Sequence, residues 1–196
     1  MKNIFERGTF SNYRVQSLLE ACGPVEIRHN YFAENKIAVF ISHKHDDLEE
    51  LKGIIGFLEK EYGVKCYIDS KDPSLPKTTS GETAKRIKQR IGECNKFILL
   101  ATDKAIDSKW CNWELGYGDA EKKIDNVAIF PIKEKASLNA QYKGNEYMEI
   151  YPYVVERHQG DKYDSGELIA PGYYIRSKKL NGSGFVIEPL DKWLKK

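Results

Sequence analysis

From Lys36 onward, the sequence alternates short runs rich in β-branched residues with longer amphipathic segments. This alternation is typical of a parallel sheet covered by helices, because strands buried on both faces form continuous apolar runs. The predicted strands are 37–42, 64–69, 96–101, 127–132 and a weaker one at 151–155. The pattern therefore favours an α/β fold built on a five-stranded, doubly wound parallel sheet.

The segments between these strands carry helix signals. Apolar residues recur at helical spacing over 48–62, Gly63 ends that helix, and Ser80 with Thr83 opens a second one. The Gly- and Tyr-rich stretch between 155 and 190 shows no clear period. The remaining predictions are a helix at 110–122, short helices at 11–21 and 190–194, a polar connection at 102–109, and a loop at 70–79, where Pro73 and Pro76 interrupt regular structure.

The length of 196 residues suits one domain with extensions. We expect residues 36–135 to form the domain core, 1–35 to be an N-terminal extension, and 136–196 to complete the domain and extend it. No stretch approaches the roughly 20 apolar residues that cross a bilayer, and the N-terminus lacks the apolar core of a signal peptide. We therefore expect a cytoplasmic protein with no membrane contact.

Charge and cysteine content narrow the classes of partner. The 31 Lys/Arg and 29 Asp/Glu residues leave a formal charge of +2, which gives no broad positive field for a nucleic acid. The cysteines fall at unrelated spacings without a CxxC pair, so we expect buried free thiols in a reducing compartment. They are Cys22, Cys66, Cys94 and Cys111.

Phosphate-binding fingerprints are absent from the sequence. The segment 80–85 lacks the GxxxxGK[ST] spacing, and neither Gly116-Tyr-Gly118 nor Gly182-Ser-Gly184 continues as GxGxxG after a strand. The sequence therefore disfavours a P-loop NTPase and a standard dinucleotide-binding fold.

Ligands of an open parallel sheet bind beyond the carboxyl ends of its strands, so charged residues at these positions are candidates for a functional site. His43, His45, Asp46 and Asp47 follow the first strand, but no matching ligand set occurs elsewhere, and helix capping is the preferred interpretation. We expect no metal ion. The acids at 46 and 47, Asp103 and Lys133 resemble a receiver-domain acid pocket in composition, but their registers fit poorly, and we interpret them as surface charge.

One segment combines large aromatic rings with an acid at the start of a predicted helix. Trp110, Trp113 and Glu114 lie within five residues, just beyond the strand at 96–101. The i, i+4 spacing of Trp110 and Glu114 places both side chains on one helix face. On spacing alone, core tryptophans beside a solvated acid are the more common arrangement. The alternative is a site in which a flat ring lies beside a carboxylate.

Such a pair suits cleavage of a nucleotide's N-glycosidic bond. An aromatic face can stack on a base, and a carboxylate can stabilise an oxocarbenium-like ribosyl transition state. Glycoside hydrolases usually need a second, protonated carboxyl group for the leaving group. The nicotinamide of NAD does not, because its ring nitrogen is already cationic and it departs neutral. One ionised carboxylate, that of Glu114, could therefore suffice.

Three segments in order add a more specific signal. They are Val39-Phe-Ile-Ser-His43, Tyr67-Ile-Asp69 and Ser108-Lys-Trp-Cys-Asn-Trp-Glu114. They resemble the first-strand box, the entry to the BB loop and the WxxxE box of bacterial TIR (Toll/interleukin-1 receptor) domains. The resemblance covers residues 36–133, about half of the chain, and the flavodoxin-like fold of that family agrees with the fold that the periodicity favours.

The resemblance implies an NAD glycohydrolase, sometimes ending in a cyclised or modified ADP-ribose signal, in Thoeris-like antiphage defence. NAD would be the substrate, with no other cofactor, and Glu114 the catalytic acid. The substrate-binding positions that it implies are Ser42, His43, Lys44, Asp69 and Trp110. Asp69 also begins a loop that in such domains often contacts a neighbouring subunit. We therefore expect self-association through TIR domains, and an effector or sensor protein as a further partner.

Two other functions remain open at this point. A TIR domain can act only as a signalling scaffold, although a scaffold has no need of Trp110 and Glu114 together. A nucleoside-processing transferase of related fold would turn over free nucleosides and leave NAD intact.

Overall fold

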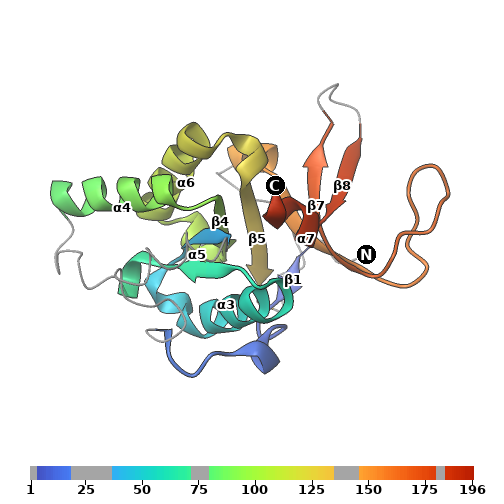
Figure 1. Cartoon of the computed structure of the whole chain (residues 1–196), viewed down its shortest axis with the longest axis horizontal. Coiled ribbons are helices and arrows are strands. Elements are labelled where there is room, and N and C mark those ends of the chain that lie inside the picture. Colours follow the sequence, from blue (N-terminus) through green and yellow to red (C-terminus); the bar gives the residue numbers. More distant parts are fainter. Residues whose placement is uncertain (1–3, 19–36, 72–79, 135–145, 180–183) are drawn as a thin grey trace.

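The computed structural model describes residues 4–18, 37–71, 80–134, 146–179 and 184–196 (Figure 1). The strands are β1 (Phe5–Glu6), β2 (Ala38–Ser42), β3 (Lys65–Tyr67), β4 (Lys96–Ala101), β5 (Val127–Lys133), β6 (Tyr153–Arg157), β7 (Gly172–Lys178) and β8 (Phe185–Pro189). The α-helices are α3 (Leu48–Tyr62), α4 (Gly81–Glu93), α5 (Asp103–Ile106), α6 (Lys109–Lys122) and α7 (Leu190–Lys195). Short 3-10 turns are η1 (Ser11–Tyr13), η3 (His45–Asp47), η4 (Asp69–Lys71), η5 (Ile124–Asn126) and η6 (Glu146–Ile150).

Strands β3-β2-β4-β5-β6 form a parallel sheet in that order, which is the flavodoxin-like topology. The five predicted parallel strands are therefore confirmed. The sheet is wider than predicted, because β7 and β8 extend it as antiparallel strands beyond β6, and β1 pairs with β5. The sequence prediction missed β7 and β8 because their glycine, tyrosine and charged residues give no clean alternation.

Strand periodicity decides which helices each side chain meets. In β2, Val39 and Ile41 enter the apolar cluster that contains α3, whereas Phe40 enters the cluster that contains α4 and α6. Figure 1 shows α3 on one side of the sheet and α4 and α6 on the other. Because successive side chains alternate between faces, Ser42 points to the α6 side. In β4 the same alternation sends Leu99 to the α6 side and Leu100 to the α3 side.

The predicted element boundaries needed several corrections. The polar connection at 102–109 contains the short helix α5, which Thr102 caps by accepting a hydrogen bond from the Ala105 N–H. Strand β3 is shorter than 64–69, and β6 starts two residues after the predicted 151. Within the described part of the predicted helix at 11–21, η1 forms at 11–13 and Leu18 is again helical, whereas positions 19–21 and 72–79 lie outside the described residues.

The N-terminal segment 4–18 packs against α3. Phe5 and Phe10 are fully buried in the cluster around α3, with their ring centroids 5.2 Å apart. The backbone approaches α3 so closely that a Cβ at Gly56 would lie 1.8 Å from the Tyr13 carbonyl oxygen. Glycine at this position is therefore a requirement of docking.

Candidate active site

Helix α6 carries Glu114 against the sheet. Ser108 caps the helix by accepting a hydrogen bond from the Cys111 N–H, which places the start of α6 beyond the carboxyl end of β4. Farther along, a Cβ at Gly118 would lie 2.8 Å from the Phe97 ring, so the glycine allows α6 to lie close to the strand. Glu114 lies between these two points and is 1% exposed. It is not the solvated acid that spacing alone favoured.

Ser42 at the end of β2 holds one oxygen of this carboxyl group. Its hydroxyl donates a hydrogen bond of 2.5 Å to Glu114 Oε2, and both residues are buried. The other oxygen, Oε1, is also buried, and no described residue gives it a hydrogen bond of ordinary geometry. A buried carboxylate oxygen without a donor is costly and unusual in a purely structural role. It marks the position where a ligand can complete the site.

The environment of Glu114 favours its neutral form. Burial raises the pKa of Glu114 well above the ordinary value, and the Asp69 carboxylate adds to the rise. The Ser42 hydroxyl and the Trp110 indole lower the pKa of Glu114 and so oppose the rise. The indole acts from nearby, without a well-formed hydrogen bond to Glu114. A cationic group arriving beside Oε1 would favour the ionised form. Ionisation of Glu114 would therefore be linked to the arrival of a cation.

His43 follows Ser42 and is buried between η4 and the end of β2. Its Nε2 lies 3.0 Å from Ser70 Oγ, and its Nδ1 lies 3.3 Å from the Ile41 carbonyl oxygen and 3.9 Å from Asp69 Oδ1. Burial lowers the pKa of His43 and outweighs the opposing effect of Asp69. The imidazole is thus held as a neutral polar group, with both ring nitrogens bonded within the protein.

Trp110 is the first ring of an aromatic row along α6. Its ring centroid lies 4.9 Å from that of Trp113, which in turn lies 6.3 Å from Tyr117. Lys88 on α4 sits over the last ring, with Nζ 4.9 Å from the Tyr117 centroid. Both tryptophans are partly exposed. Trp110 is therefore the ring that is both close to Glu114 and accessible.

The structure brings together most of the residues that the sequence singled out. We refer to Ser42, His43, Asp69, Trp110 and Glu114 as the Glu114 site. Lys44 lies next to it, half-buried, with its carbonyl oxygen accepting a hydrogen bond of 2.9 Å from the Asp47 N–H. Its side chain makes no hydrogen bond to these five residues among the described contacts. The substrate contacts predicted for Lys44 and for the residues of the Glu114 site stay predictions.

Two residues beside the Glu114 site were not found from the sequence. Ser70 holds His43, and Cys111 lies one helical turn before Glu114 with its thiol beside the Ser42 hydroxyl. Burial raises the pKa of Cys111 to about 11, so this thiol is neutral at physiological pH. The spacing of three residues between Cys111 and Glu114 was the sequence signal that could have identified Cys111 as a neighbour of Glu114. Cys66 and Cys94 are also buried and form no disulfide, as predicted, whereas Cys22 lies outside the described residues.

A second polar cluster contains Asp47, which the sequence analysis interpreted as surface charge. Asp47 is 1% exposed, and its two oxygens accept hydrogen bonds from Arg7 and Thr102. It is the N-cap residue of α3 by position, but its side chain makes no capping bond, so the predicted capping role is wrong. We refer to Arg7, Asp47 and Thr102 as the Asp47 cluster. Lys133 is also buried, with Nζ 3.6 Å from Asp103 Oδ1.

Within the described part of the chain, no group of three or more His, Cys, Asp or Glu residues is placed to hold a metal ion. None of the described helices is both long enough and apolar enough to span a bilayer.

Comparisons with known proteins agree with this fold and site. A family model described as TIR domain matches residues 39–163. A protein of Bacillus cereus (strain MSX-D12), named probable 3' cyclic ADP-D-ribose synthase ThsB', is 33% identical over 135 residues. The match covers 67% of this chain and 68% of that protein. The chain therefore belongs to the TIR domain family, as its three sequence motifs indicated.

Proposed function

We propose that this chain cleaves NAD at the nicotinamide–ribose bond and converts the ADP-ribosyl group into a cyclic ADP-ribose. The observation that carries the proposal is the buried Glu114 carboxyl, held by Ser42 on one oxygen and open to a ligand on the other. The Bacillus cereus relative, whose name describes a cyclic ADP-ribose synthase, supports the choice of substrate and product.

The chemistry needs one carboxylate. The bond between ribose C1′ and the nicotinamide nitrogen breaks with its electron pair going to nitrogen, so the ring leaves neutral and needs no proton. Positive charge then develops on the ribose, where Glu114 Oε1 can stabilise it in a site of low polarity. The raised pKa of Glu114 leaves the empty site without a bare buried charge, and the cationic nicotinamide ring favours ionisation when it binds.

The neighbouring side chains supply position rather than proton transfer. Ser42 fixes the orientation of the carboxyl group, and the partly exposed Trp110 offers a face for the base. The half-buried Lys44 would contact the ribose or the phosphates, and the buried His43 would border the ribose. Asp69 begins η4, the turn that precedes residues 72–79 in the sequence. No cofactor has a role in this scheme.

Cyclisation requires that a group of the same molecule reach C1′ before water does. That group forms the new bond to C1′ as the bond to nicotinamide breaks, and its proton passes to the ionised Glu114 carboxylate, whose raised pKa favours the protonated form. The burial of Glu114 supports this outcome, since a site with little water favours an intramolecular acceptor. We further propose that the product is a signal for a separate effector in cytoplasmic antiphage defence, and that the chain self-associates through its TIR domain.

The test is the Glu114→Gln variant, which keeps the shape of the side chain and removes its charge. We expect NAD consumption to fall by at least about 100-fold. Purified protein is incubated with NAD, and nicotinamide, ADP-ribose and cyclic ADP-ribose are separated and identified by mass spectrometry. Glu121→Gln, an exposed acid on the same helix, is the matched control and should retain wild-type turnover.

Two results would overturn the proposal. Undiminished NAD consumption by Glu114→Gln would remove the catalytic role of this residue. A wild-type protein that releases no nicotinamide at any concentration, including those at which it self-associates, would favour a signalling scaffold.

A further inference from the structure

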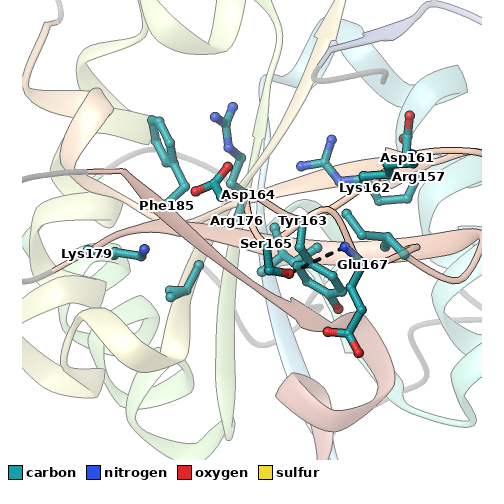
Figure 2. Close-up of a pocket in the computed structure, with 13 residues that line it drawn as sticks. Arg157, Asp161, Lys162, Tyr163, Asp164, Ser165, Glu167, Arg176, Lys179 and Phe185 are labelled. Atoms are coloured by element: carbon teal, nitrogen blue, oxygen red, sulfur yellow. Dashed lines mark hydrogen bonds between the residues drawn. The ribbon is translucent and has the colours of Figure 1, made fainter.

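A hollow lies in the antiparallel part of the sheet, and the NAD chemistry does not use it. Its volume is about 510 Å³, and it is formed by β6, β7, β8 and the connection from β6 to β7 (Figure 2). None of the residues that line it belongs to the Glu114 site. We refer to it as the hairpin pocket. Its volume falls within the range of ordinary small-molecule sites.

The hairpin pocket contains a buried, unpaired arginine. Arg157 is 4% exposed and lines the pocket, yet its Nε and Nη1 atoms have no hydrogen-bond partner and no described carboxylate forms an ion pair with it. Burial lowers the pKa of Arg157, the nearby Arg176 acts in the same direction, and the Asp161 carboxylate opposes both without forming an ion pair with Arg157. A buried guanidinium with two unbonded nitrogen atoms is unfavourable, which makes an anionic ligand the natural partner.

Arg176 is placed on the same wall by the strand register. Arg157 pairs with Gly172 and Tyr153 pairs with Arg176, so both arginines lie on one face of the β6–β7 ladder. Arg176 Nη1 donates a hydrogen bond of 2.6 Å to the Tyr153 hydroxyl, and its guanidinium carbon lies 3.6 Å from the Phe185 ring centroid. Arg176 is therefore held in place beside an aromatic ring.

The rest of the lining adds both charge and rings. Lys162 and Lys179 contribute two further cations, against the three acids Asp161, Asp164 and Glu167. Four cations against three acids leave the wall with an excess of one positive charge, while Asp161 is already engaged by the His158 N–H. Phe185 and Tyr163 contribute flat faces, and Figure 2 shows Tyr163 between Arg176 and Glu167.

We propose that the hairpin pocket binds a nucleoside monophosphate or a closely similar phosphorylated ring compound. Arginine forks match the oxygens of a phosphate, and the phosphate would supply the hydrogen-bond acceptors that Nε and Nη1 of Arg157 lack. The ring would lie against Phe185, and the acids would accept hydrogen bonds from ribose hydroxyls. The site is separate from the one that cleaves NAD, and its occupancy would stabilise the antiparallel strands.

The experiment measures thermal unfolding and calorimetric binding of the full chain with AMP, adenosine or inorganic phosphate. AMP should raise the melting temperature by about 3 °C at saturating concentration, more than either fragment does. In Arg157→Met, which keeps the side chain's bulk, AMP affinity should fall by at least about tenfold. The unliganded variant should melt at or above the wild-type temperature, because a buried unpaired charge has been removed.

Three further variants locate the effect. Lys192→Met removes an exposed charge outside the pocket and should leave AMP binding unchanged. Phe185→Leu should lower AMP binding to the level of inorganic phosphate. The rise in melting temperature with AMP should persist in Trp110→Ala. This result would show that AMP does not act through the NAD site. Absence of AMP binding to the wild type, equal binding of phosphate and AMP, or AMP binding that survives Arg157→Met would each overturn the proposal.

Discussion

Asp47 and Glu114 are two buried carboxyl groups beyond the carboxyl ends of the same parallel strands, and they differ in how completely they are bonded. Each is 1% exposed, and each accepts a hydrogen bond from a hydroxyl at the end of a strand. Asp47 also receives Arg7 Nη2 at 2.8 Å, so both of its oxygens and its charge are satisfied. Glu114 has only Ser42 and no cation among the described residues.

Strand periodicity separates the two groups. Ser42 follows Phe40 on the α6 side of β2, whereas Thr102 follows Leu100 on the α3 side of β4. The α3 side also receives the N-terminal segment, which brings Arg7 to Asp47. The difference teaches that burial alone does not mark a reactive acid. A buried acid that lacks a counter-charge does, because the fold tolerates that instability only where a ligand relieves it.

The largest expected effect comes from removing the satisfied carboxylate. Asp47→Ala leaves Arg7 and Thr102 without their partner, and we expect the free energy of unfolding to fall by about 3 kcal/mol. Chemical denaturation followed by tryptophan fluorescence measures this change. The NAD turnover of the fraction that remains folded should stay near the wild-type value. A stable Asp47→Ala protein with no turnover would reverse the assignment of the two acids.

The next effect concerns the hydroxyl that holds Glu114. We expect Ser42→Ala to lower kcat by about tenfold to 100-fold, since a hydrogen bond to a charged group is worth about 1.5–3 kcal/mol. Ser42 also lowers the pKa of Glu114, so its loss should move the acid limb of the kcat–pH profile to higher pH. Thr102→Val, which removes the corresponding bond to Asp47, is the matched control. A profile that does not move in Ser42→Ala would show that Ser42 only fills space.

The sequence predicted the parallel half of this molecule well and the antiparallel half poorly. Continuous apolar runs such as 96–101 specify a strand buried on both faces, and the capping pair Ser80 and Thr83 specified the start of α4. Strand β8, with exposed residues such as Val186, has no such pattern because much of it faces solvent. Its pairing with β7 is decided by long-range contacts, which local propensity does not contain.

For the Glu114 site, the motifs located the residues but did not predict whether each is buried or exposed. Spacing predicted that Trp110 and Glu114 share a helix face, yet it favoured a solvated acid, and only the packing of α6 on β4 buries it. Asp47 shows the converse failure. Its partner Arg7 lies 40 positions away, in a segment without a clear secondary-structure signal. No local sequence pattern could therefore predict that Asp47 is buried.

A smaller effect should appear in the stability of Glu114→Gln. The folded pKa of Glu114 is raised, so the folded state binds a proton more readily than the unfolded state, and the wild type loses stability as pH rises above the ordinary carboxyl value. We expect the variant to be more stable than the wild type by about 1 kcal/mol at pH 7.5, with the gain vanishing near pH 4. Denaturation at both pH values measures this. A variant less stable than the wild type at pH 7.5 would contradict the assigned direction of the shift.

The smallest effect should come from Asp46, which is adjacent to Asp47 in the sequence but exposed. Its Oδ2 lies 3.3 Å from Lys104 Nζ, and both side chains are more than half exposed, at 61% and 58%. Water and salt screen such a pair, and we expect Asp46→Asn to change the free energy of unfolding by less than about 0.5 kcal/mol. The same denaturation experiment measures it beside Asp47→Ala. If the two variants were equally unstable, the contribution of Asp47 would lie in the local turn η3 rather than in its bonds to Arg7 and Thr102. A large difference between these neighbours would instead show that position relative to the sheet, and not the acidic run itself, determines what each carboxylate does.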